Sequence, residues 1–150
     1  MAIADMFLKI PNVKGEARDP DHKDEVEVVS WSWGAHSNAY AGGGQRTMDM
    51  LVIVKKIDSA STALLKCLAE NQVTTAKLVV RKAGKTPAEY FIVEMDKVRV
   101  TSVTVDTSDA ELNEHVSLAF EKITWNYRAQ QADGSLGGAM SYSYEARRPS

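Results

Sequence analysis

Hydrophobic and polar residues alternate along most of the chain, and the alternation changes phase at several points. The clearest case lies between residues 114 and 128. In its first half the apolar residues occupy even-numbered positions, Val116, Leu118 and Phe120, and in its second half they occupy odd-numbered positions, Ile123, Trp125 and Tyr127. We call such a switch a change of parity. One extra residue in a strand turns all later side chains to the opposite face. We interpret this stretch as one long strand that turns a corner, as in barrels and orthogonally packed sheets.

Alternation of period two predicts further strands before and after this stretch. Two of them also change parity. The strand 26–33 is expected to bend, and 90–105, which changes parity twice, is expected to bend twice or to break into two strands. Residues 34–46 contain three consecutive glycines and are expected to form a long loop, which in compact proteins is usually functional or mobile. The predicted strands are 6–10, 26–33, 47–57, 74–83, 90–105 and a short final one near 140–144.

The predicted strand 47–57 is apolar on both faces. Its two sets are Met48, Met50, Val52 and Val54 on one side, and Leu51, Ile53 and Ile57 on the other. A strand that is apolar on both faces must be covered on both. We expect the core of the domain to cover one face and a neighbouring subunit the other.

One segment, residues 58–70, has the period of an amphipathic helix. Asp58 or Ser59 is expected to cap its beginning, and Asn71 suits its C-terminal end. The predicted apolar stripe consists of Ala60, Leu64, Cys67 and Leu68, widened by Leu65. The chain is therefore predicted to be mainly β with one helix, and nothing in its composition divides residues 1–150 into two domains.

Length and charge limit the classes of function. The 150 residues suffice for one core, and the net charge of -2 argues against nucleic acid as the main partner. No apolar run is long enough to cross a bilayer, and the first residues do not have the form of a secretory signal. The single cysteine cannot form an internal disulfide. These observations predict a soluble protein that folds in a reducing cytoplasm.

No set of residues has the spacing of a known catalytic, metal or phosphate site. The glycines 42–44 are not followed by the Lys-Ser/Thr of a phosphate loop, and the acidic residues near Asp19 do not fit a calcium loop. The acidic loop is expected to be solvated, the three histidines to lie at the surface or in loops, and Cys67 and the tryptophans to be core residues. We therefore expect no enzyme activity, no metal and no cofactor.

Several short segments follow one another along nearly the whole chain in a recognisable order and spacing. They are Lys14-Gly15-Glu16 with Asp19 and His22, Glu27-Val28, residues 30–34, residues 56–61, residues 81–84, residues 114–120 and residues 123–127. Taken together, they resemble the Hcp (haemolysin-coregulated protein) family of the bacterial type VI secretion system. Ser61-Thr62 departs from the resemblance, since relatives often have a proline there, and the loop from residue 35 to 46 varies in the family.

The resemblance implies a compact two-sheet antiparallel β-barrel with one α-helix at about residues 59–70. It also implies a homohexameric ring, with rings stacked into the inner tube that a contractile sheath drives outward. The expected partners are other copies of the chain, the spike protein, the sheath and effector proteins carried in the lumen, without membrane insertion. The protein would assemble in the cytoplasm and then be secreted by the type VI system.

Three groups of residues are candidates for the assembly surfaces. The loop is expected to reach the adjacent ring through His36, Asn38, Tyr40, Gly42, Gly43, Gly44, Gln45 and Arg46. Ser30 and Ser32, opposite Trp31 in the pleat, are expected to face the lumen. The subunit-interface candidates are Met48, Met50, Val52 and Val54.

Two alternatives stay open at this point. One is a monomeric β-barrel that binds a small ligand, with or without hydrolytic activity, which would need an apolar cavity with a few convergent polar groups. The other is a tail-tube subunit of a phage, which would also assemble into a tube. The sequence does not identify the effectors, and it does not distinguish a main tube protein from a specialised paralogue.

Overall fold

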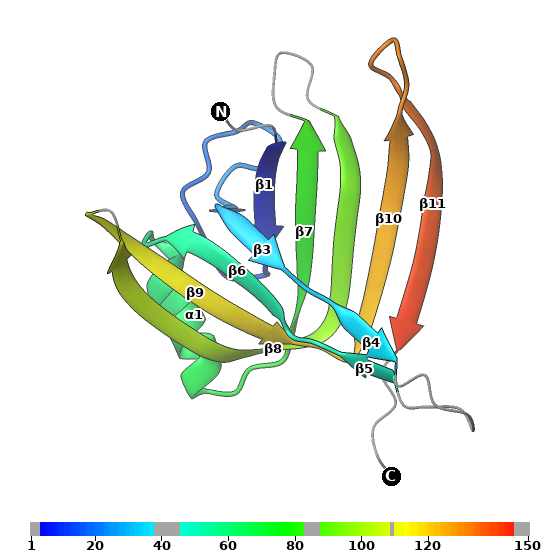
Figure 1. The fold of residues 1–150 in the computed structure, drawn as a ribbon. Helices are drawn as coiled ribbons and strands as arrows, with labels where there is room; N and C mark the ends of the chain where they lie inside the picture. Colours follow the sequence, from blue (N-terminus) through cyan, green and yellow to red (C-terminus); the bar gives the residue numbers. More distant parts are fainter. Residues whose placement is uncertain (1–3, 38–45, 83–87, 109, 146–150) are drawn as a thin grey trace.

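The computed structural model describes residues 4–37, 46–82, 88–108 and 110–145. Figure 1 shows two antiparallel sheets that share one long, bent strand, with one helix beside them. The prediction of a mainly β fold with two sheets and one helix is confirmed. No helix among the described residues has the length and apolar character needed to cross a membrane.

The first sheet contains β2, β1, β7, the first half of β8, β10 and β11, and the second contains the rest of β8 with β9, β6 and β3. A short pair, β4 with β5, stands apart. The bounds are β1 Ala4–Lys9, β2 Val26–Glu27, β3 Ser30–Ser32, β4 Ala35–Ser37, β5 Arg46–Met48, β6 Leu51–Lys56, α1 Ala60–Ala69, β7 Thr74–Lys82, β8 Glu89–Ser108, β9 Glu111–Ala119, β10 Lys122–Gln130 and β11 Leu136–Glu145.

Strand β8 belongs to both sheets because it bends twice. Lys97 adopts a positive φ of 52°, and the register against β9 shifts between Val100 and Ser102. Each irregularity moves the later side chains to the other face. The two predicted parity changes of this strand are thereby confirmed.

The stretch from 114 to 128 also divides between the two sheets. Strand β9 pairs with the second half of β8, and β10 pairs with its first half. Phe120 and Glu121, where the parity changes, lie between the strands. The corner is confirmed, and it separates two strands because each half pairs with a different part of β8.

The chain from 26 to 32 joins the free edges of the two sheets. The Val28 N–H donates to the carbonyl of Met6 in β1, and the Val29 N–H donates to the carbonyl of Val54 in β6. Consecutive residues thus hydrogen-bond to opposite edges. The prediction of one bent strand is therefore wrong in one respect, because the chain forms two short strands, β2 and β3, on different sheets. The connection between them brings the two sheets together around one core.

Three elements predicted from the alternation have wrong boundaries. Residues 34–46 are not entirely loop, because β4 pairs antiparallel with β5. The predicted strand 47–57 is interrupted at Asp49 and Met50, since the Asp49 N–H donates to the Gly34 carbonyl at the base of that pair. The final strand is longer than predicted, because β11 follows β10 as a hairpin partner for most of its length.

Helix α1 buries Leu64 and Cys67 in the core, as predicted, but Leu65 is 56% exposed and does not widen the stripe. Its first turn is held from several sides. Ser59 occupies the N-cap position without a capping bond from its side chain, and the preceding Asp58 carboxylate accepts from the Ala60 N–H at 2.9 Å in its place. Glu16, far away in the sequence, accepts from the Ser59 N–H at 2.7 Å.

Candidate functional site: the assembly surfaces

The predicted lumen and interface residues meet on one face of the second sheet. The register places Ser30 opposite Val54 and Ser32 opposite Val52, and directly opposed residues share a face. Both serines are exposed and both valines are half-buried. The two predictions therefore concern the same surface, which the sequence alone did not reveal because it does not say which strands pair.

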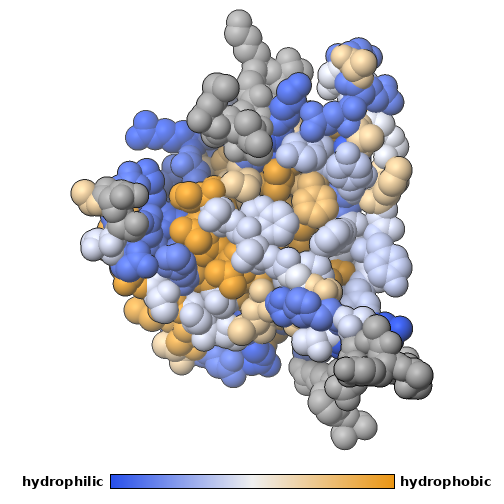
Figure 2. Space-filling model, in the orientation of Figure 1, coloured by the Kyte–Doolittle hydropathy of each residue, from blue (hydrophilic) through white to orange (hydrophobic). Residues whose placement is uncertain are grey.

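This surface is polar apart from its valines. Across β9, Val52 is paired with Ser117 and Val54 with His115. The His115 Nε2 lies 3.3 Å from the Asp106 carboxylate, and both side chains are partly exposed. Figure 2 shows an apolar area over β3 and β6 with hydrophilic surface at its borders. We call this surface, on β3, β6 and β9, the serine face.

The ring-stacking candidates fall on the β4–β5 pair and on residues outside the described part of the chain. His36 and Arg46 are exposed on β4 and β5. We call this pair of strands the arm. Asn38, Tyr40, Gly42, Gly43, Gly44 and Gln45 lie outside the described residues.

Asp49 fixes the base of the arm. Its carboxylate lies 2.9 Å from the His36 Nε2, and its carbonyl accepts from the Trp33 indole N–H at 2.7 Å. Together with the bond from the Asp49 N–H to Gly34, these contacts tie both strands of the arm to the end of β3. The direction of the arm is therefore set in part by Trp33 and Asp49, which lie on either side of the predicted loop.

An exposed aromatic face, which was not predicted from the sequence, lies on one side of the β10–β11 hairpin. Its cross-strand pairs are Ile123 with Tyr144, Trp125 with Tyr142, and Tyr127 with Met140. Tyr142 is 73% and Met140 68% exposed. The opposite side is polar, as in the bond between Thr124 and Ser143 at 2.8 Å.

Trp125, predicted to be a core residue, is 43% exposed. Its ring meets Trp33 edge-on at 5.5 Å and Phe91 at 5.4 Å between centroids, so it lies at the border of the core. The sequence signal that could have revealed this face is the alternation of Ile123, Trp125 and Tyr127 with polar residues. The prediction is wrong because period two shows which residues share a face but not whether anything covers them.

An open cleft of about 460 Å³ separates the arm from the aromatic face. Its lining includes Trp33, His36, Arg46, Met48, Trp125 and Tyr142. Met48, one of the interface candidates, therefore belongs to this cleft and packs partly against the core. The cleft combines large aromatic surfaces with basic groups on the arm.

A buried ionic network lies between β6, β9 and the beginning of α1. The Lys55 Nζ is 2.5 Å from Glu114, 2.9 Å from Asp58 and 3.2 Å from the Ser61 hydroxyl. This network was not predicted from the sequence. Lys55 shares the parity of the buried Leu51 and Ile53, so its place in the alternation is the signal that could have found it.

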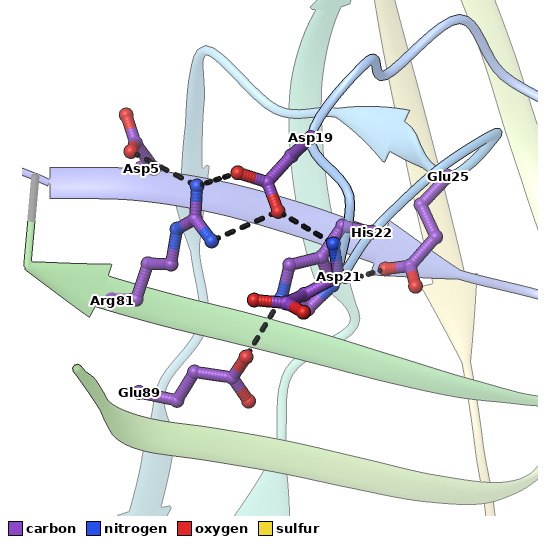
Figure 3. Close-up of polar contacts among 7 residues, drawn as sticks. All are labelled: Asp5, Asp19, Asp21, His22, Glu25, Arg81 and Glu89. Atoms are coloured by element: carbon purple, nitrogen blue, oxygen red, sulfur yellow. Dashed lines mark hydrogen bonds and ion pairs between the residues drawn. The ribbon is translucent and has the colours of Figure 1, made fainter. Parts of the chain in front are cut away.

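Figure 3 shows a second polar cluster, where residues 11–25, which we call the strap, cross β1 and the ends of β7 and β8. Arg81 forms an ion pair with Asp19, with Nη1 and Oδ1 3.0 Å apart, and its guanidinium lies 4.9 Å from the centroid of the Phe7 ring. Asp5 is a more distant partner at 3.5 Å. The bond from Arg81 lowers the pKa of Asp19, and the Asp21 N–H contributes.

His22 is buried in the same cluster. It stacks on Phe7 with centroids 4.4 Å apart, and its ring nitrogens lie 2.9 Å from Glu25 and 2.8 Å from Glu89. The expected solvated acidic loop is found at Asp21 and Asp24, which are exposed, whereas Asp19 and Glu25 are paired, and His22 lies in the loop as expected but is buried. The strap is held down because its charged groups find partners on β7 and β8, at separations of 62 and 67 residues in the sequence.

Comparisons with known proteins identify the family. The model of the family described as "Type VI secretion system effector, Hcp" matches residues 7–127. The chain is 36% identical to Protein hcp1 of Pseudomonas aeruginosa over 155 aligned residues, which cover 96% of each protein.

Solved structures agree with this assignment. Hcp1 from Salmonella typhimurium superposes with a TM-score of 0.80 at 32% identity, covering 96% of this chain and 95% of the other. A structure described as a type six secretion system protein gives a TM-score of 0.88 at 25% identity over 96% of each chain. Neither a ligand-binding barrel nor a phage tail tube is favoured by these findings. The chain therefore belongs to the Hcp family and is a tube subunit of a type VI secretion system.

Proposed function

We propose that six copies of this chain close into a ring and that rings stack into the expelled inner tube. The observation that carries the proposal is the aromatic face of β10–β11, which the described residues leave uncovered. Large exposed apolar patches mark interaction sites. A ring made of heterologous contacts covers such a patch on every copy and leaves none open.

We further propose that the serine face lines the lumen. Ser30, Ser32 and Ser117 are polar and small, and a polar wall suits a water-filled channel through which effectors pass. Because Val52 and Val54 share this face, we place them on the lumen wall instead of the subunit contact. Met48, which lies in the cleft, remains an interface candidate, whereas Met50, at the end of β6, has no assigned role.

The arm is proposed to carry residues 35–47 toward the adjacent ring. Its exposed polar side chains and its fixed base support this role, since a contact between rings needs a projecting segment with a defined direction. The spike and the sheath are proposed partners at the end and outside of the tube. The protein is proposed to act without catalysis, to assemble in the cytoplasm and to leave through the type VI system.

Thiol labelling tests the place of the serine face. In a Cys67→Ala background, Ser32→Cys in purified rings should react with a small maleimide about as fast as in protein unfolded by denaturant. Leu8→Cys, at a fully buried core position, provides the protected reference. Protection of Ser32→Cys in the ring, together with reactivity in separated subunits, would place the serine face in a subunit contact and overturn the lumen assignment.

A further inference from the structure

We propose that the ring contact is made by the aromatic cleft of one copy and the opposite end of the next, where β8 turns into β9. This inference rests on the proposed function, since it assumes that copies close into rings. It names the two surfaces that meet and the residues that fit together. We call the second surface the β8–β9 end, and it consists of Ile57, Val105 and Leu112.

The cleft has the composition of a receiving surface. Aromatic side chains provide large apolar area at low entropic cost and are enriched in protein interfaces. Here Trp125, Tyr127 and Tyr142 stand on one side of a hairpin whose other side is polar. One face of the hairpin is thus apolar although the described part of the chain leaves it exposed. Arg46 adds a positive charge at the edge of the cleft.

The β8–β9 end is a second uncovered apolar surface. Val105 is 52% and Leu112 47% exposed, and Ile57 is next to Leu112, to whose carbonyl its N–H donates. By register these three aliphatic side chains lie on one face of the second sheet. The acidic Asp106 and Glu111 lie on the other face, where they pair with His115 and Lys56. The β8–β9 end therefore offers an aliphatic patch to an aromatic cleft.

The two surfaces lie at opposite ends of the molecule. Figure 1 shows the turn between β8 and β9 on one side, and the arm with β10 and β11 on the other. One copy cannot bring its own two surfaces together, whereas copies arranged head to tail can. A repeated contact between two different patches produces a closed ring when the rotation closes.

Strand direction supports the same arrangement. In the second sheet β8 pairs with β9, β9 with β6 and β6 with β3, and each pair is antiparallel. The edge strands β8 and β3 consequently run in opposite directions. When a copy follows head to tail, its β8 edge approaches the preceding β3 edge as an antiparallel neighbour. Trp33, which directly follows β3, then leads into the cleft.

Cross-linking between introduced cysteines tests the contact. In a Cys67→Ala background, Tyr142→Cys marks the cleft and Leu112→Cys marks the β8–β9 end. Rings of the double variant, treated with a short bis-maleimide, should give a covalent ladder up to the full ring. A mixture of the two single variants should give covalent dimers at most, and each single variant alone should give none.

The matched control replaces Tyr142→Cys by Ser143→Cys, on the polar side of β11, and should give no ladder with Leu112→Cys. If Tyr142→Cys impairs folding, Met140→Cys marks the same face. Intact rings without cross-links, or dimers from Tyr142→Cys alone, would overturn this contact and leave the ring proposal standing. A chain that stays monomeric before any cross-linker is added would instead overturn the proposed function, and this contact with it.

Discussion

Lys55 and Glu114 form an ion pair inside the protein, with 2.5 Å between Nζ and Oε1 and side-chain exposures of 0% and 2%. The pair joins β6 to β9, and Asp58 and Ser61 extend it to the beginning of α1. A buried charge is tolerated only when it is paired and hydrogen-bonded. The network therefore fixes how the helix sits against the second sheet, the sheet that we propose lines the lumen.

Removing one partner of this pair should be strongly destabilising. We expect Glu114→Leu to lower the free energy of unfolding by about 3–5 kcal/mol, because it leaves Lys55 buried with less than its full set of partners. Urea titration followed by tryptophan fluorescence measures the change. The double variant Lys55→Met/Glu114→Leu should regain most of the loss, since no unpaired charge remains.

The chain offers a matched control on the same two strands. Lys56 and Glu111 form an ion pair of 3.3 Å whose side chains are 62% and 56% exposed. Glu111→Leu should change the free energy of unfolding by less than about 1 kcal/mol, as is usual for surface pairs. If Glu114→Leu costs no more than Glu111→Leu, the role given to the buried network is wrong.

The pair of Asp19 and Arg81 should make stability depend on pH in the acid range. Arg81 lowers the pKa of Asp19 in the folded protein below its ordinary value near 4. The stabilisation is therefore present above that ordinary value and is lost as the pH falls through the lowered one. We expect Asp19→Asn to reduce the melting temperature at pH 7 and the difference from the unchanged protein to shrink below about pH 4.

Arg81→Met provides the check on the cause of this effect. In an Arg81→Met background, Asp19→Asn should have little further effect at pH 7, because the partner that lowers the pKa of Asp19 is gone. A difference in melting temperature between the Asp19→Asn variant and the unchanged protein that stays constant from pH 7 to pH 3 would show that the carboxylate does not stabilise the strap through its charge.

Gly15 should not tolerate a side chain. A Cβ at this position would overlap the Glu25 carbonyl oxygen and lie 2.8 Å from the Val26 Cα, where the two ends of the strap approach each other. The Gly15 N–H also donates to the Asp24 carbonyl at 2.8 Å. We expect Gly15→Ala to cost about 1–3 kcal/mol by overpacking, measured in urea. Gly138→Ala, which meets nothing within 4 Å, is the control and should be nearly neutral.

Shortening the loop of the arm should separate ring formation from stacking. Deletion of Gly42, Gly43 and Gly44 removes residues that we propose reach the adjacent ring, and it leaves the cleft and the β8–β9 end intact. Negative-stain images should show single rings where the unchanged protein gives stacks. Loss of the rings themselves would contradict the role assigned to this loop.

Much of the fold could be predicted from the sequence because phase changes in the alternation mark corners. The changes near residues 97 and 121 correspond to the bend of β8 and the corner between β9 and β10. The alternation could not show which strands pair. For that reason Ser32 and Val52 were given different roles although they lie opposite each other.

The candidate site was harder to predict from the sequence than the fold, because it depends on contacts between residues that are distant in the sequence. Asp49 and His36 tie the arm, and His22 and Glu89 tie the strap, through pairs that no local pattern reveals. The face of Trp125 was visible as a pattern, yet its exposure follows from the absence of a covering strand in the described fold. The family resemblance predicted the tube function, and the arrangement of the strands identified the surfaces that we propose take part in assembly.

The mass of the protein in solution tests the central claim most directly. Native mass spectrometry or light scattering at micromolar concentration should give six times the chain mass of 16.5 kDa. Tyr142→Arg should shift the distribution toward single copies, because a charge in the cleft disrupts the contact. A stable single copy of the unchanged protein across the concentration range would contradict the account.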